Sequence, residues 1–213
     1  MAQQISLKEA ERKAYRITTN DGLWDIFLGC FFLIFAIAPF LSRSLGDFWS
    51  SVVFLPFWGL VYLVMRLVRK QVVTPRIGVV KFGQARKNKL MKFSVVMVAV
   101  NVVALILGLV AAASFGMLPG QIYSILLGIL LLIGFSIAAY LLDFSRLYLY
   151  GLLVGLSPLV GEWLWNRGAA SHHGFPITFG VASGIMILVG LVVFVRLLHE
   201  NPVLNEGVPT QKA

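Results

Sequence analysis

Acidic residues and cysteine are scarce in this chain. Its 213 residues include nine Asp and Glu and one cysteine, and charged residues make up 13 % of the composition, against about 25 % in soluble domains. This low charge, together with a hydrophobic content of 59 %, excludes a soluble globule and a disordered chain. The single cysteine, Cys30, excludes a disulfide scaffold and gives no information about the redox compartment. The class that remains is a polytopic membrane protein.

Long uncharged stretches set the number of membrane spans. About 20 mostly apolar residues cross a hydrocarbon core of about 30 Å. Residues 93–142 contain no charged side chain, which is too long for one span, and the Pro119-Gly120 turn divides them in two. The sequence therefore predicts an all-α integral membrane protein, a six-transmembrane-helix bundle. We expect its spans over residues 23–41, 48–65, 93–115, 122–142, 147–166 and 177–195, within a membrane domain of residues 23–198.

The distribution of Lys and Arg predicts the orientation. If the N-terminus is cytoplasmic, 16 of the 18 basic residues fall on the cytoplasmic side, and only Arg43 and Arg167 face outward. We therefore expect an N-in/C-in, multi-pass protein of a prokaryotic cytoplasmic membrane. The net charge of +9 follows from this arrangement, so that a nucleic-acid partner is not expected.

Two segments flank the membrane domain. In residues 1–22, Ser6 and Glu9 have the spacing of a capping box and predict a short amphipathic helix over about residues 6–17. This helix is either a solvated lead-in or a surface anchor for anionic lipid or a partner. Asn20 or Asp21 is expected to cap the first span, and residues 199–213 are expected to form a flexible cytoplasmic tail.

The basic cytoplasmic loop, residues 66–92, is the most distinctive stretch. It contains nine basic residues and no acid. The β-branched residues of 71–74 and 77–82, on either side of Pro75, predict an extended or hairpin-like excursion, and residues 84–92 predict a helix that continues into the third span. We expect the loop to bind anionic lipid headgroups or a protein partner. Its expected binding residues are Arg69, Lys70, Arg76, Lys81, Arg86, Lys87, Lys89 and Lys92.

Few polar residues lie within the predicted spans. Asn101 is expected to form an interhelical hydrogen bond, and Glu162 is expected at headgroup level. Asp143 and Arg146, three residues apart, are expected to form a local ion pair. Proline-interrupted spans in corresponding positions can mark a transporter site. An outward vestibule would then be lined by Pro56, Trp58, Asn101, Pro158 and Glu162.

Small residues at four-residue spacing predict close helix packing. Gly151 with Gly155, and Gly180 with Gly184, have the spacing that lets two helix backbones approach. We expect them to pack the last three spans together or to form the seam of a homo-oligomer.

Three functional hypotheses remain open. The first is a non-enzymatic accessory or interaction protein that acts through its basic loop. The alternative is a small transporter or channel for a neutral or lipophilic solute, or for protons. An enzyme has only Ser136, His172 and His173 to offer, and the sequence has no HExxH, P-loop or CxxC motif, so that no metal or cofactor is expected.

Overall fold

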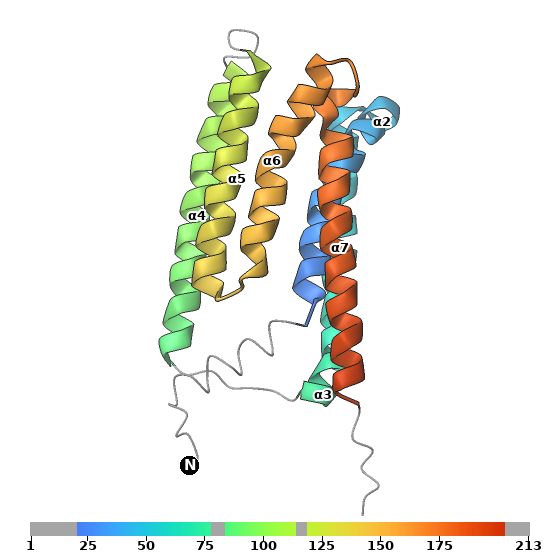
Figure 1. The fold of residues 1–213 in the computed structure, drawn as a ribbon, viewed down its shortest axis with the longest axis vertical. Coiled ribbons are helices and arrows are strands. Elements are labelled where there is room, and N and C mark those ends of the chain that lie inside the picture. Colours follow the sequence, from blue (N-terminus) through green and yellow to red (C-terminus); the bar gives the residue numbers. More distant parts are fainter. Residues whose placement is uncertain (1–20, 78–83, 114–118, 203–213) are drawn as a thin grey trace, which may run out of the picture.

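The computed structural model describes residues 21–77, 84–113 and 119–202, which are helical or lie in turns between helices. In chain order the elements are α2 (Leu23–Val68), the π-helix η1 (Arg69–Val73), α3 (Thr74–Ile77), α4 (Gln84–Ala113), α5 (Gly120–Leu142), α6 (Arg146–Asn166), the 3₁₀-helix η2 (His172–Gly174) and α7 (Phe175–Glu200) (Figure 1). No strand occurs among these residues.

Within the described residues, the structure confirms six helical segments long and apolar enough to cross a membrane. They are Leu23–Gly46, Phe48–Arg76, Lys87–Val110, Gly120–Leu142, Arg146–Asn166 and His172–Glu200. Each overlaps one predicted span. The predicted amphipathic helix lies outside the described residues, as does the chain from residue 203 onward.

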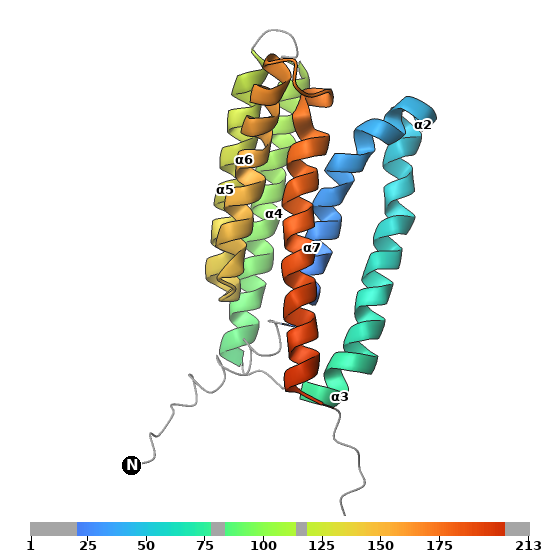
Figure 2. The same ribbon diagram turned by 45° about the vertical axis from the view of Figure 1, so that its right-hand side comes forward.

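The first two spans form one element, α2, which reverses direction at Gly46. This residue has φ 77° and ψ 164°, a conformation that is accessible essentially only to glycine. Figure 2 shows α2 rising beside α7, bending over and descending as a separate arm. We call Leu23–Gly46 the first half of α2 and the segment from Phe48 its second half.

Two glycine-lined seams hold the bundle together. Between α2 and α7, a Cβ on Gly29 would lie 2.6 Å from Ile187 Cγ1. Between α5 and α6, a Cβ on Gly155 would lie 3.0 Å from the carbonyl oxygen of Gly128. Glycine therefore lets these helix pairs approach more closely than larger residues would allow.

The core lies where the first half of α2 meets α5, α6 and α7. Tyr150, Val154 and Met186 are fully buried there, and the Phe32 ring stacks on Phe179 with a centroid distance of 6.1 Å. The most apolar stretches of α4 and of the second half of α2 contain no buried residue. These two helices are therefore the most peripheral, and their apolar side chains suit contact with lipid.

The basic loop is helical where an extended excursion was predicted. Residues 71–74 continue the second half of α2 through η1 into α3, and Val73 is 3 % exposed. The Thr74 hydroxyl donates a hydrogen bond to the Arg69 carbonyl (2.8 Å). Burial and backbone bonding here override the weak strand preference of β-branched residues. The helix predicted over residues 84–92 is confirmed as the start of α4, whereas residues 78–83 lie outside the described residues.

Candidate functional site

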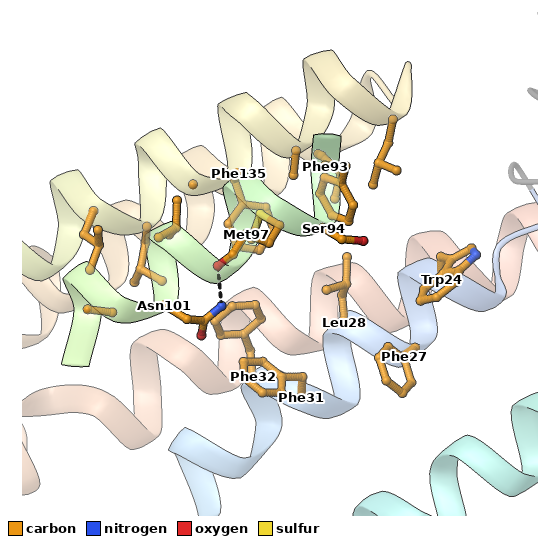
Figure 3. Close-up of a pocket in the computed structure, with 18 of the residues that line it drawn as sticks. Trp24, Phe27, Leu28, Phe31, Phe32, Phe93, Ser94, Met97, Asn101 and Phe135 are labelled. Atoms are coloured by element: carbon orange, nitrogen blue, oxygen red, sulfur yellow. Dashed lines mark hydrogen bonds between the residues drawn. The ribbon is translucent and has the colours of Figure 1, made fainter. Parts of the chain in front are cut away.

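An apolar pocket of about 750 Å³ lies between the first half of α2, α4 and α5 (Figure 3). Its volume is in the range of small-molecule sites, roughly 300–1,000 Å³. Trp24, Leu90 and Leu142 line it where α2 begins and α5 ends, and Ala104 and Leu130 line it near the middle of the bundle. From Leu90 to Ala104 the pocket follows α4 for about 21 Å, at about 1.5 Å per residue.

Aromatic and aliphatic side chains form most of the pocket wall. Its larger members are Trp24, Phe27, Phe31, Phe32, Phe93, Met97 and Phe135. Figure 3 shows the α2 rings facing Met97 and Asn101 of α4 across the pocket. Among the described residues that line it, Arg69 alone carries a charge. The pocket is therefore suited to a lipophilic molecule.

Asn101 lies on the wall of this pocket, and its side chain is exposed. Its Nδ2 donates to the carbonyl of Met97 on the same helix (2.8 Å), so that this amide group does not make the predicted interhelical bond. Ser94 behaves in the same way, because its hydroxyl donates to the Leu90 carbonyl (3.2 Å). Both side chains satisfy a donor within α4 and add weak polarity to an apolar surface.

Arg69, at one end of the pocket, forms an ion pair with Asp21. Arg69 Nη2 lies 3.1 Å from Asp21 Oδ2, and the Asp21 side chain is 0 % exposed. Asp21 Oδ1 accepts a hydrogen bond from the Leu23 amide (3.0 Å), although the N-cap position of α2 is occupied by Gly22 and not by the predicted Asn20 or Asp21. Burial raises the pKa of the Asp21 carboxyl above its ordinary value, and the Arg69 guanidinium opposes that shift.

Two further ion pairs join helices at the same end of the bundle. Arg146 Nη1 lies 2.6 Å from Asp25 Oδ2, whose side chain is 0 % exposed and lies beside Tyr150. Lys89 Nζ lies 2.8 Å from Asp143 Oδ2. The sequence predicted a local ion pair between Asp143 and Arg146 but not these partners on other helices. The residues that face the α5–α6 turn come from α4 and α2, which are distant in sequence. We call this end, where α2 and α4 begin and α5 and α7 end, the basic end.

The other expected binding residues of the loop lie on helix ends. Lys70 is in η1, and Arg76, in α3, donates from Nη1 to the Val72 carbonyl (2.7 Å). Lys87 and Lys92 are exposed on the first turns of α4. The Arg86 side chain and Lys81 lie outside the described residues.

The structure does not bring the five expected vestibule residues together. Asn101 lines the pocket, and Trp58 packs edge-on against Phe27 at a centroid distance of 4.7 Å. Pro56 is exposed on the second half of α2, whereas Pro158 is buried in α6. Glu162 lies toward the opposite end of the bundle.

Glu162 forms a separate cluster there with His173 and the start of α5. Its Oε2 lies 2.8 Å from His173 Nδ1, and its side chain is 8 % exposed, less than expected for a carboxylate at headgroup level. A Cβ on Gly120 would lie 2.6 Å from Glu162 Oε1, so the carboxylate sits against the N-terminus of α5, where a negative charge is favourable. Among the described residues no group of three His, Cys, Asp or Glu could hold a metal ion.

The residues of the enzyme hypothesis are also apart. Ser136 lies in the half of α5 nearer the basic end, and its hydroxyl donates to the Leu132 carbonyl (2.7 Å). His172 and His173 lie in η2, at the opposite end of the bundle. The structure therefore does not assemble these three side chains into one site.

The glycines expected to pack have different surroundings. A Cβ on Gly151 would lie 2.6 Å from Phe135 Cβ, so that Gly151 and Gly155 face α5 within the chain. A Cβ on Gly180 would lie 3.7 Å from Ala36 Cβ, and one on Gly184 would have nothing within 4 Å.

Comparison with protein-family models, with curated proteins and with solved structures finds no match to this chain.

Proposed function

We propose that this chain is a non-enzymatic integral membrane protein that binds a lipophilic molecule within the bilayer. The observation that carries the proposal is the apolar pocket of about 750 Å³ between α2, α4 and α5. With the orientation expected from the basic residues, the basic end faces the cytoplasm and the pocket lies in the cytoplasmic half of the membrane.

The incomplete packing between α2 and α4 supports this proposal. The close contacts of the bundle are those of α2 with α7 and of α5 with α6, whereas α4 packs mainly on α5. Phe31 of α2 is 37 % exposed, and Asn101 of α4 is exposed, although both lie on the pocket wall. The pocket therefore has accessible apolar surface that a bound molecule would cover.

The basic loop gives this protein a second means of contact. Exposed Arg66, Lys70, Lys87 and Lys92 lie on helix ends at the basic end, where they would attract anionic headgroups. An accessory role, in which the protein holds a lipid and docks through this surface to a partner, combines both features.

Transport of a lipophilic solute is the alternative, and it would use the same pocket. It would require a second opening toward the end of the bundle that holds Glu162 and His173. The described wall of the pocket ends near Ala104 and Leu130, and neither Pro158 nor Glu162 belongs to it. Binding without translocation is therefore the function that this geometry favours.

Filling the pocket tests the proposal. Ala104→Trp places a large ring on the wall, and Val102→Trp is a matched control, because Val102 is 50 % exposed and lies outside the pocket lining. The proteins are purified from native membranes in mild detergent, and native mass spectrometry identifies bound small molecules. We expect a stoichiometric lipophilic species on the wild type and on Val102→Trp, and at least a severalfold loss on Ala104→Trp. The absence of such a species from the wild type, or equal retention by both variants, would overturn the proposal.

A further inference from the structure

Resting on the proposed function, we infer that the occupant is an anionic amphiphile resident in the membrane, with a carboxylate or phosphate head on a long hydrocarbon tail. The head would bind Arg69, and the tail would lie along the pocket toward Ala104. The charge of Arg69 at the end of an otherwise uncharged pocket wall is the observation that carries this inference.

Selection of such a ligand depends on its head. Moving a hydrocarbon tail from the bilayer into an apolar pocket gives no hydrophobic gain, because lipid is as apolar as the pocket wall. Shape and polar contacts must therefore distinguish one membrane molecule from another. A guanidinium forms paired hydrogen bonds with carboxylate and phosphate oxygens, and these are among the strongest hydrogen bonds in proteins.

Asp21 positions Arg69 without reaching the pocket. Arg69 Nη2 lies 3.1 Å from Asp21 Oδ2, while the Asp21 side chain is 0 % exposed and does not line the pocket. The Arg69 side chain is 33 % exposed. Because a guanidinium has five N–H donors, Arg69 can contact an anion in the pocket in addition to its protein partners.

Each described acid at the basic end is paired with a basic residue, Asp21 with Arg69 itself. Asp25 is paired with Arg146, and Asp143 is paired with Lys89. Exposed Lys70, Lys87 and Lys92 add further positive charge at the basic end. An anionic head is therefore attracted to the end of the pocket where Arg69 lies.

The length of the pocket suits a chain rather than a compact solute. With the head at Arg69, the tail would follow α4 past Leu90 and Met97 to Ala104, a distance of about 21 Å from Leu90. Trp24 lines the pocket near the head, so that its fluorescence can report on an occupant.

Two ligands with the same tail test the inference. The probes are brominated hexadecanoate, an anion, and brominated hexadecanol, its neutral counterpart, because bromine quenches nearby tryptophan. The full chain is reconstituted in phosphatidylcholine nanodiscs, and Trp24→Phe measures the background from the other tryptophans. Titrations give the affinity for each probe.

The variants separate charge from folding. Asp21→Asn keeps Arg69 and should keep the preference for the anion. Asp21→Asn/Arg69→Gln removes both charges together, which leaves no buried carboxylate without its partner, and should remove that preference. Arg69→Lys keeps the positive charge beside Asp21 but lacks the planar guanidinium, and it should weaken the preference for the anion over the alcohol. It therefore tests the inference even if the double variant does not fold.

We expect the wild type to bind the anion at least about tenfold more tightly than the alcohol. One hydrogen bond to a charged group is enough to produce a difference of this size. Equal binding of both probes to the wild type, or an unchanged preference in Asp21→Asn/Arg69→Gln and Arg69→Lys, would overturn the inference and leave the pocket as a lipophilic site. Failure of both probes to quench Trp24 would instead overturn the proposed function.

Discussion

The Asp25 carboxylate of α2 and the Arg146 guanidinium of α6 lie 2.6 Å apart, and the Asp25 side chain is 0 % exposed. The pair joins the starts of two helices beside the pocket. An ion pair in a buried setting is sensitive to the loss of one partner, because the remaining charge is left without compensation.

Arg146→Gln is therefore expected to lower the free energy of unfolding by about 3–5 kcal/mol, as for other broken buried pairs. Asp25→Asn/Arg146→Gln, which removes both charges, should recover most of that loss. Reversible unfolding in detergent micelles measures the two effects. A double variant no more stable than Arg146→Gln would show that the pair is not the source of the loss.

The stability contributed by Asp21 should depend on pH. Burial raises the pKa of its carboxyl in the folded protein above the ordinary value of 3.8, so that the folded state binds this proton more tightly than the unfolded state. The contribution of Asp21 to the free energy of unfolding is greatest below pH 3.8, and it is lost as the pH rises through the raised pKa of the folded protein. The free energy of unfolding of the wild type minus that of Asp21→Asn should therefore fall over this window. Unfolding from about pH 3 to pH 7 measures it, and a difference that rises with pH would contradict the expected sign.

Gly29→Ala should destabilise the seam between α2 and α7. Its Cβ would lie 2.6 Å from Ile187 Cγ1 and 3.0 Å from the Ser183 carbonyl oxygen, and the crowding should cost about 1–3 kcal/mol. Gly108→Ala is the matched control, because a Cβ there has nothing within 4 Å and should be neutral or stabilising. Thermal unfolding of both variants in one detergent compares them, and equal effects would exclude close packing as the cause.

Cysteine labelling distinguishes binding from transport. In a Cys30→Ser background, cysteines that replace Trp58 and Pro158 should resist a membrane-impermeant thiol reagent, because Trp58 packs against Phe27 and Pro158 is buried. A cysteine that replaces Arg167, in the turn after α6, is the positive control. Rapid labelling at both test positions would favour the outward vestibule and the transporter hypothesis.

Patterns along the chain were enough to predict the six spans. Uncharged stretches of sufficient length, divided at Pro119-Gly120 and at Asp143, correspond to the observed helices. The π-helical continuation through Val73 was not predictable from residue type, because β-branched residues favour strands in general and burial decides here.

The ion pairs and the pocket could not be predicted for different reasons. Asp21 with Arg69, and Lys89 with Asp143, are far apart in sequence and meet only through packing. The pocket wall uses Trp24, Phe27 and Phe31 at helical spacing, but a helix in lipid is apolar on every side, so that no polar face marks which side binds. Asn101 and Arg69 were singled out from the sequence, Asn101 as an amide within a span and Arg69 as a basic loop residue, but no pattern placed them in one pocket.

Gly46 has a consequence for biosynthesis. A straight helix over the 46 residues of Leu23–Val68 would be about 69 Å long, more than twice the hydrocarbon thickness of about 30 Å. The reversal at Gly46 divides this length into two stretches that each suit one crossing, so that the two spans can enter the bilayer together as a hairpin. A residue with a Cβ at position 46 would disfavour this backbone conformation and oppose formation of the hairpin.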